Sequence, residues 1–115
     1  MKISEGCAAV SSGRRQEWHY GGYAQVVEVE ACGFKGDHAV ARAWLVSGGE
    51  AYRRQAWGLY RLDEIYPIRE LVDLCDAPHK GYGHPDLRLE ATACEAVRVP
   101  VLEAGLQVAP SAARS

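Results

Sequence analysis

The sequence lacks the features that mark membrane-spanning and secreted proteins. No apolar run approaches the roughly 20 residues that a membrane-spanning helix needs. The beginning of the chain has no basic stub followed by an apolar stretch and a small-residue cleavage site. We therefore expect a cytoplasmic protein that does not enter a membrane.

Cysteine is sparse, and its spacing argues against two common cysteine-based architectures. Cys7, Cys32, Cys75 and Cys94 stand singly, with no Cys-x-x-Cys pair. This pattern is typical of neither a dense disulfide framework nor a zinc ribbon. We interpret the four residues as reduced thiols, most of them buried.

Motifs that carry catalysis are also missing. The segment Gly81-Tyr82-Gly83 lacks the strand-to-helix context of a phosphate-binding loop, and no Ser/His/Asp signature is present. Cys75, His79, His84 and Asp86 are metal-ligand types, but their Cys-x3-His-x4-His spacing matches no common zinc signature. We therefore predict a non-enzymatic protein with neither a metal nor a cofactor.

What is present indicates one soluble globular domain. The chain has 115 residues, of which 48% are apolar and 24% charged, and a formal net charge of −2. This charge argues against a general polyanion binder but permits a local basic patch. We assign residues 1–13 to a flexible N-terminus, 14–109 to the domain with its C-terminal extension, and 110–115 to a disordered tail.

Turn signals recur at short intervals, which is typical of a small β-rich fold. A two-residue turn at Gly21-Gly22 places Tyr20 opposite Tyr23 and Trp18 opposite Gln25. Register decides which residues share a sheet face, so this turn predicts one apolar face and one polar face. The apolar face comprises Trp18, Tyr20, Tyr23, Val27, Val29 and Ala31, and the polar face comprises Glu17, His19, Glu28 and Glu30.

A second turn, at Gly36-Asp37, extends the same apolar face. Its register pairs Ala31 with Arg42, Val29 with Trp44 and Val27 with Val46. Residues 38–46 also have good helix propensity, but the agreement between the two turns favours a strand. Together the turns predict a meander with one core.

Later segments are less regular. Residues 57–62 are expected to form a fourth strand, followed by a tight turn at 63–65. Residues 68–75 fit either a short helix that begins at Pro67 or a fifth strand that closes the sheet. Residues 87–93 alternate and fit another strand.

Four segments form a series of motifs: residues 26–34 (VVEVEACGF), 40–44 (VARAW), 57–65 (WGLYRLDEI) and 78–86 (PHKGYGHPD). In order and spacing they resemble the three strand motifs and the later Gly-Tyr segment of WYL domains, above all of the short stand-alone members. The Trp-Tyr-Leu triplet itself is absent, and Glu64 stands where the family has a second basic residue. The resemblance implies a mainly β protein, an SH3-type or Sm-like small barrel of about five strands, with α+β as the fallback. It also implies a sensing module that uses basic residues on a groove.

Arg42 is the most informative single residue. The predicted register places it among apolar side chains, where an unpaired guanidinium is very costly. It therefore either pairs with Asp63 or a neighbouring glutamate, or reaches a groove rim and holds an anion. Residues 38–61 carry four arginines against Glu50, a net +3, whereas residues 62–76 carry one arginine against five acids, a net −4.

These patterns predict a binding module for an anionic ligand, namely a nucleotide or a short single-stranded nucleic acid. The ligand-binding residues would be Arg42 and Arg61 to hold charge, Trp57 and Tyr82 to stack, and Arg53 and Arg54 to steer.

Two alternatives remain open at this point. One is a protein-interaction module that self-associates, for instance as a homodimer, through its sheet edges or through the exposed apolar loop. The other is a small hydrolase-like enzyme with a cleft built on Asp63, Glu64 and His79.

Overall fold

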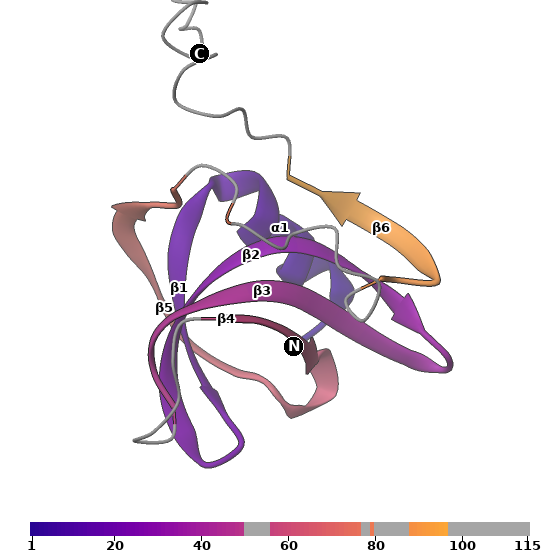
Figure 1. The fold of residues 1–115 in the computed structure, drawn as a ribbon, viewed down its shortest axis with the longest axis horizontal. Helices are drawn as coiled ribbons and strands as arrows, with labels where there is room; N and C mark the ends of the chain where they lie inside the picture. Colours follow the sequence, from indigo (N-terminus) through magenta and orange to yellow (C-terminus); the bar gives the residue numbers. More distant parts are fainter. Residues whose placement is uncertain (50–55, 77–78, 80–87, 97–115) are drawn as a thin grey trace, which may run out of the picture.

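The computed structural model describes residues 1–49, 56–76, 79 and 88–96. This part of the chain is mainly β, as the sequence predicted, with one N-terminal helix and six antiparallel strands (Figure 1). The elements are α1 (Ile3–Ser12), β1 (Arg14–Tyr20), β2 (Tyr23–Lys35), β3 (His38–Gly48), β4 (Ala56–Arg61), the 3-10 helix η1 (Leu62–Glu64), β5 (Tyr66–Leu74) and β6 (Ala91–Glu95).

The six strands belong to one strongly bent sheet. Its order is β4-β3-β2-β1-β5, and β6 pairs with the far half of β2. Figure 1 shows β1 and β5 running steeply across the direction of β3. Among the described strands β4 and β5 stand at the two ends of the order and do not pair with each other. Within the same residues no helix has the length and apolarity that crossing a bilayer requires.

The first hairpin has the predicted register. Tyr20 pairs with Tyr23, and the ladder continues to Gln16 opposite Val27. Gly21 and Gly22 have φ angles of 60° and 87°. A two-residue turn with two positive φ angles matches the twist of the flanking strands, and glycine adopts it without strain.

The second hairpin begins as predicted and then shifts. Its ladder runs from Lys35 opposite His38 to Ala31 opposite Arg42, so residues 38–46 form a strand and the helix alternative is wrong. Beyond that point one extra residue, Glu30, enters β2, and Val29 pairs with Ala43. The predicted pairs of Val29 with Trp44 and Val27 with Val46 are therefore wrong.

This β-bulge decides which side chains of β3 share a face with Val27 and Val29. A shift of one residue moves a strand's side chains to the opposite face of the sheet. Ala43 and Leu45, both almost fully buried, pack in the core with Val27 and Val29. Trp44 and Val46 are only partly buried and alternate with these residues, so they lie on the opposite face. We call the face that carries Trp18, Val27 and Val29 the inner face, and the opposite one the outer face.

The N-terminal segment, expected to be irregular, instead forms α1. Ala9 and Val10 of this helix are buried in the core beneath β2. Gly6 permits the close approach, because a Cβ there would lie 2.7 Å from Cys32 Sγ. Short polar residues concealed the helix in the sequence, and its burial against the sheet stabilises it.

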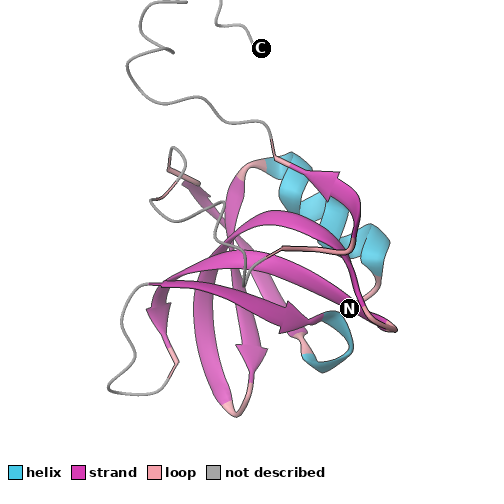
Figure 2. Cartoon of the chain, turned by 45° about the vertical axis from the view of Figure 1, so that its right-hand side comes forward, coloured by secondary structure: helices cyan, strands magenta, loops and turns pink. Residues whose placement is uncertain are grey.

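Two cysteines form a disulfide, contrary to the prediction of four reduced thiols. Cys7 in α1 is bonded to Cys94 in β6, with Cα atoms 5.8 Å apart and a separation of 87 positions in sequence. Figure 2 shows the helix lying beside this strand. Cys32 and Cys75 are free thiols. The error has a simple cause, because spacing along the chain does not reveal which distant cysteines the fold brings together.

The later elements resolve the remaining ambiguities. Residues 66–74 form β5, so the helix considered for residues 68–75 is wrong and the predicted strand is present, but among the described strands it does not pair with β4 to close the sheet. The predicted fourth strand and tight turn correspond to β4 and η1. In the described part of the chain the last strand is β6, at Ala91–Glu95 rather than at 87–93.

Removal of the disulfide tests whether this bond holds α1 and β6 together. We expect Cys7→Ser to lower the free energy of unfolding by roughly 2–4 kcal/mol, because the bond closes a long loop in the unfolded chain. Chemical denaturation of the oxidised protein and the variant measures this difference. Cys75→Ser is the matched control and should change stability by less. Equal stability of wild type and Cys7→Ser would show that the bond does not hold the two elements together.

Candidate functional site

Arg42 is engaged by a carboxylate of its own chain. Its side chain lies on the outer face with 11% of its surface exposed, and Nη2 donates to Glu95 Oε2 at 3.0 Å. Ala31 of β2 pairs with Arg42 on one side and with Glu95 on the other. The two charged residues therefore reach across a single small side chain. This arrangement agrees with the ion-pair alternative, with Glu95 in place of Asp63 as the partner.

Arg61 is also engaged by carboxylates. It donates from Nε and Nη2 to the two oxygens of Asp63, at 3.2 and 2.7 Å, and Nη1 lies 3.7 Å from Glu64. The hydrogen bonds from Arg61 hold the pKa of the Asp63 carboxyl below its usual range. This guanidinium is thus largely neutralised within its own turn.

The other predicted ligand-binding residues are only partly described. Trp57 pairs with Trp44 across β3 and β4 and packs edge-on against it, with ring centroids 5.4 Å apart. Arg53, Arg54 and Tyr82 lie outside the described residues, as do His84 and Asp86 of the metal hypothesis. Of the six residues, Arg42, Trp57 and Arg61 are therefore the three that the structure places.

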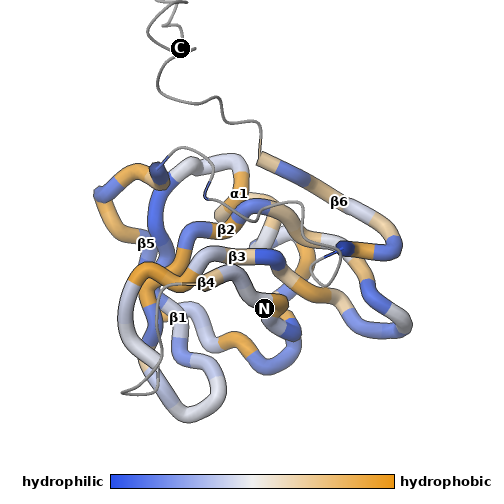
Figure 3. The backbone as a smooth tube through the Cα atoms, in the orientation of Figure 1, coloured by the Kyte–Doolittle hydropathy of each residue, from blue (hydrophilic) through white to orange (hydrophobic). Residues whose placement is uncertain are grey.

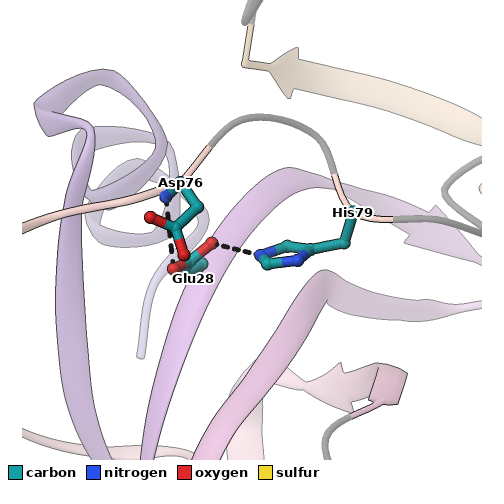
Figure 4. A group of neighbouring side chains, drawn as sticks. All are labelled: Glu28, Asp76 and His79. Atoms are coloured by element: carbon teal, nitrogen blue, oxygen red, sulfur yellow. Dashed lines mark hydrogen bonds and ion pairs between the residues drawn. The ribbon is translucent and has the colours of Figure 1, made fainter. Parts of the chain in front are cut away.

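The structure assembles a different cluster on the outer face, around Glu28 (Figure 4). Although predicted to lie on a solvated polar face, Glu28 is completely buried. Its Oε2 accepts from Arg15 Nε at 2.9 Å and from the Asp76 backbone N–H at 3.3 Å, and its Oε1 lies 2.7 Å from His79 Nε2. Arg15 Nη2 also bonds Asp76 Oδ2 at 3.1 Å.

Strand register explains why these residues meet. Glu28 pairs with Trp44, and Gln16 pairs with Val27, so Arg15 and Trp44 flank Glu28 on neighbouring strands. The imidazole of His79 stacks on Trp44, with ring centroids 4.1 Å apart and an angle of 5° between the planes. Asp76 and His79, which follow β5, are thereby held over the outer face, and they contact the buried carboxylate of Glu28.

The cluster contains residue types that bind metal ions, but the charge around it does not suit a cation. Single donor atoms of Glu28, Asp76 and His79 lie within 4.8 Å of one another. The Arg15 guanidinium, however, already bonds both carboxylates. A divalent cation placed there would lie against this positive charge, so the arrangement favours a structural ion-pair cluster.

The three residues of the hydrolase alternative are each engaged by another side chain, which does not favour a catalytic role. His79 is engaged by Glu28, whereas Asp63 and Glu64 are engaged by Arg61. Burial, reinforced by the charge of Glu28, raises the pKa of the Cys75 thiol to about 12. A thiol with such a pKa carries almost no thiolate at neutral pH and is a poor nucleophile.

A shallow cleft opens elsewhere, between α1 and the turn of the β2–β3 hairpin. It has a volume of about 360 Å³. Apolar residues including Ile3, Phe34 and Leu62 line it, together with the charged or polar residues His38 and Asp63. No pattern in the sequence pointed to this cleft.

The most unusual surface is β5, which the sequence left ambiguous. Its residues are exposed except for the partly buried Leu71, and β1 is its one neighbouring strand in the described part of the chain. Figure 3 shows apolar and charged residues interspersed along it. Four of the six large exposed apolar side chains of the described residues lie here: Tyr66 (69% exposed), Ile68 (49%), Val72 (82%) and Leu74 (64%).

The ladder between β1 and β5 is irregular. Its register shifts between Glu17 and Trp18 and again between Arg14 and Gln16. Arg14 Nη1 donates to the Val72 carbonyl at 2.8 Å within the second irregularity. The Arg69 guanidinium bonds Glu17 across the ladder at 2.7 Å.

No protein-family model, curated protein or solved structure matches the chain. The resemblance to WYL domains therefore rests on the sequence motifs alone.

The contribution of Glu28 to the free energy of unfolding can be compared with that of Glu17, which pairs with an exposed arginine. We expect Glu28→Ala to lower the free energy of unfolding by roughly 2–4 kcal/mol, because it leaves Arg15 Nε and the Asp76 N–H without their acceptor. Glu17→Ala removes an ion pair to the exposed Arg69 and should cost less than about 1 kcal/mol. Denaturant titration of both variants gives the comparison. Similar losses for the two variants would contradict a structural role for the buried carboxylate.

Thiol reactivity tests the burial of the two free cysteines. Burial raises the pKa of Cys32, like that of Cys75, from 9.0 to about 12. At pH 8 the thiolate population in the folded protein is then roughly a thousandfold lower than in the unfolded chain. We expect iodoacetamide to alkylate both residues far more slowly in buffer than in denaturant. Since both pKa values are raised, their stabilising contribution is complete below pH 9 and is lost as the pH rises toward 12.

Mass spectrometry of the alkylated protein distinguishes the two positions. Rapid labelling of Cys75 in the folded protein would show that the segment covering the outer face opens readily.

Proposed function

We propose that this chain is a small non-enzymatic interaction domain that presents the open edge of β5 to another protein. The observation that supports this proposal is the concentration of exposed apolar side chains on a terminal strand, with Val72 82% exposed. Soluble proteins rarely leave such side chains together on a sheet edge unless a partner covers them. A partner that adds a strand would bury them and bond the free backbone groups.

Binding of an anionic ligand stays a prediction. It requires Arg42 and Arg61 to exchange Glu95 and Asp63 for the ligand, at the cost of leaving those carboxylates without their cations. Of the arginines that the sequence assigned to the ligand, the two that the structure describes are therefore already engaged within the chain. The edge of β5 needs no such exchange, and we favour it for this reason.

Two finer expectations are part of this proposal. Membership of the WYL class, and with it closure into a small SH3-type barrel, is supported by the motif order and by the strong bend of the sheet. Cytoplasmic localisation also stays a prediction, although the bond between Cys7 and Cys94 favours an oxidising compartment.

Peptide selection tests the proposed edge without knowledge of the natural partner. Random peptides of about 12 residues, displayed on phage, are selected against the immobilised full chain. We expect the enriched peptides to be extended and apolar, and their affinity to fall at least about tenfold on Val72→Lys, since the lysine charge would be placed in the covered strip. Val72 is so exposed that its replacement should alter stability by no more than about 0.5 kcal/mol.

Tyr23→Lys is the matched control, because Tyr23 is an exposed aromatic residue on β2 (43% exposed). Binding that is unaffected by Val72→Lys, or is abolished equally by Tyr23→Lys, would refute a docking edge at β5.

A further inference from the structure

We propose that the partner of β5 is a second copy of this chain, joined by an antiparallel β5–β5 pairing about a two-fold axis at Leu71. This inference rests on the proposed function, because it requires the edge of β5 to be a docking surface. It goes further by naming the occupant and the register. The argument comes from the order of charged and apolar residues along the strand.

Two-fold symmetry makes Arg69 and Asp73 of β5 complementary, and it places Glu70 opposite the second copy's Val72. In such an interface, if one residue faces another, the second residue of the same chain faces the first residue of the copy. With Leu71 opposite itself, Arg69 faces the second copy's Asp73, and Asp73 faces the second copy's Arg69. The same register places Ile68 opposite the second copy's Leu74. The ion pair and the apolar pair therefore each occur twice.

The side chains that this register uses are available. Arg69 is bonded to Glu17 through Nε alone, so both terminal nitrogens of its guanidinium remain to bond a second carboxylate. Asp73 makes no hydrogen bond or ion pair with the described residues, although its charge adds to those of Glu28 and Asp76 in raising the pKa of Arg15. Ile68 is 49% exposed and Leu74 64%, so covering them removes substantial apolar surface from water.

A competing register centred between Arg69 and Glu70 would pair those two residues instead. Glu70, however, already accepts a hydrogen bond from Gln16 at 3.2 Å, and this bond holds the pKa of its carboxyl below the usual range. That register would also place Pro67, which has no N–H to donate, within the ladder. Centring on Leu71 confines the pairing to residues 68–74 and leaves Pro67 outside.

The backbone also suits pairing at this centre. Arg14 Nη1 bonds the Val72 carbonyl from the side of β1. Carbonyls of successive strand residues point in opposite directions, so we expect those of Leu71 and Asp73 to point to the open edge. Leu71 and its counterpart would then exchange both backbone hydrogen bonds across the two-fold axis.

Charge reversal tests the partner and the register together. Sedimentation equilibrium of the full chain should show a dimer whose dissociation constant rises with salt. Arg69→Asp and Asp73→Arg should each weaken this dimer by about 30-fold or more, because each variant opposes like charges twice. An equimolar mixture of the two variants should restore dimers, since the introduced aspartate of one chain then faces the introduced arginine of the other. The double variant Arg69→Asp/Asp73→Arg should dimerise alone.

Matched variants separate the competing outcomes. Restoration on mixing Arg69→Asp with Glu70→Arg, but not with Asp73→Arg, would overturn the register at Leu71. A wild-type chain that is monomeric up to about 1 mM, while selected peptides still bind at Val72, would overturn the second copy as partner and leave the proposed function standing. A monomer that binds no peptide at β5 would overturn both. Thermal unfolding of every variant confirms that the changes leave the monomer folded.

Discussion

The one-residue shift at Glu30 is the constraint on which the rest of the structure depends. On the turn side of the shift Cys32 pairs with Ala41, and beyond it Val29 pairs with Ala43, so β2 changes which of its side chains face the core while β3 keeps the same set there. Small and branched residues, Ala43 and Leu45, consequently fill the inner face, and Trp44 is placed on the outer face. A sheet with tryptophan on its outer surface needs further chain to cover it, and residues beyond β5 provide that cover.

Two ion-pair systems hold the covering segments in place. Glu28 binds Arg15 and His79 where the chain passes over Trp44, and the bond between Arg42 and Glu95 holds β6 beside β2. Burying these charges is costly, so each is matched by an opposite charge or a hydrogen-bond donor. The same matching leaves little unbalanced charge on the outer face with which to attract an anion.

Function is therefore better supported at the edge of the sheet than on its face. On the outer face, aromatic rings stack on one another and charged side chains form ion pairs with one another. Along β5, by contrast, apolar side chains are exposed and the strand has one neighbour in the described residues. The charges interspersed with them do not attract a general polyanion, but they can select a register. A sheet edge with this composition is suited to recognising another strand.

The sequence by itself determined the first hairpin, the mainly β class and the turn at Gly36-Asp37, because these depend on contacts between close neighbours in the chain. It also determined that Arg42 needs a partner, since a buried guanidinium requires one whatever the fold. Only the tertiary structure decided that this partner is Glu95, that Cys7 bonds Cys94, and that the chain beyond β5 covers Glu28. These contacts join residues 53, 87 and 51 positions apart in sequence, and a local pattern carries no information about which distant segments meet in space.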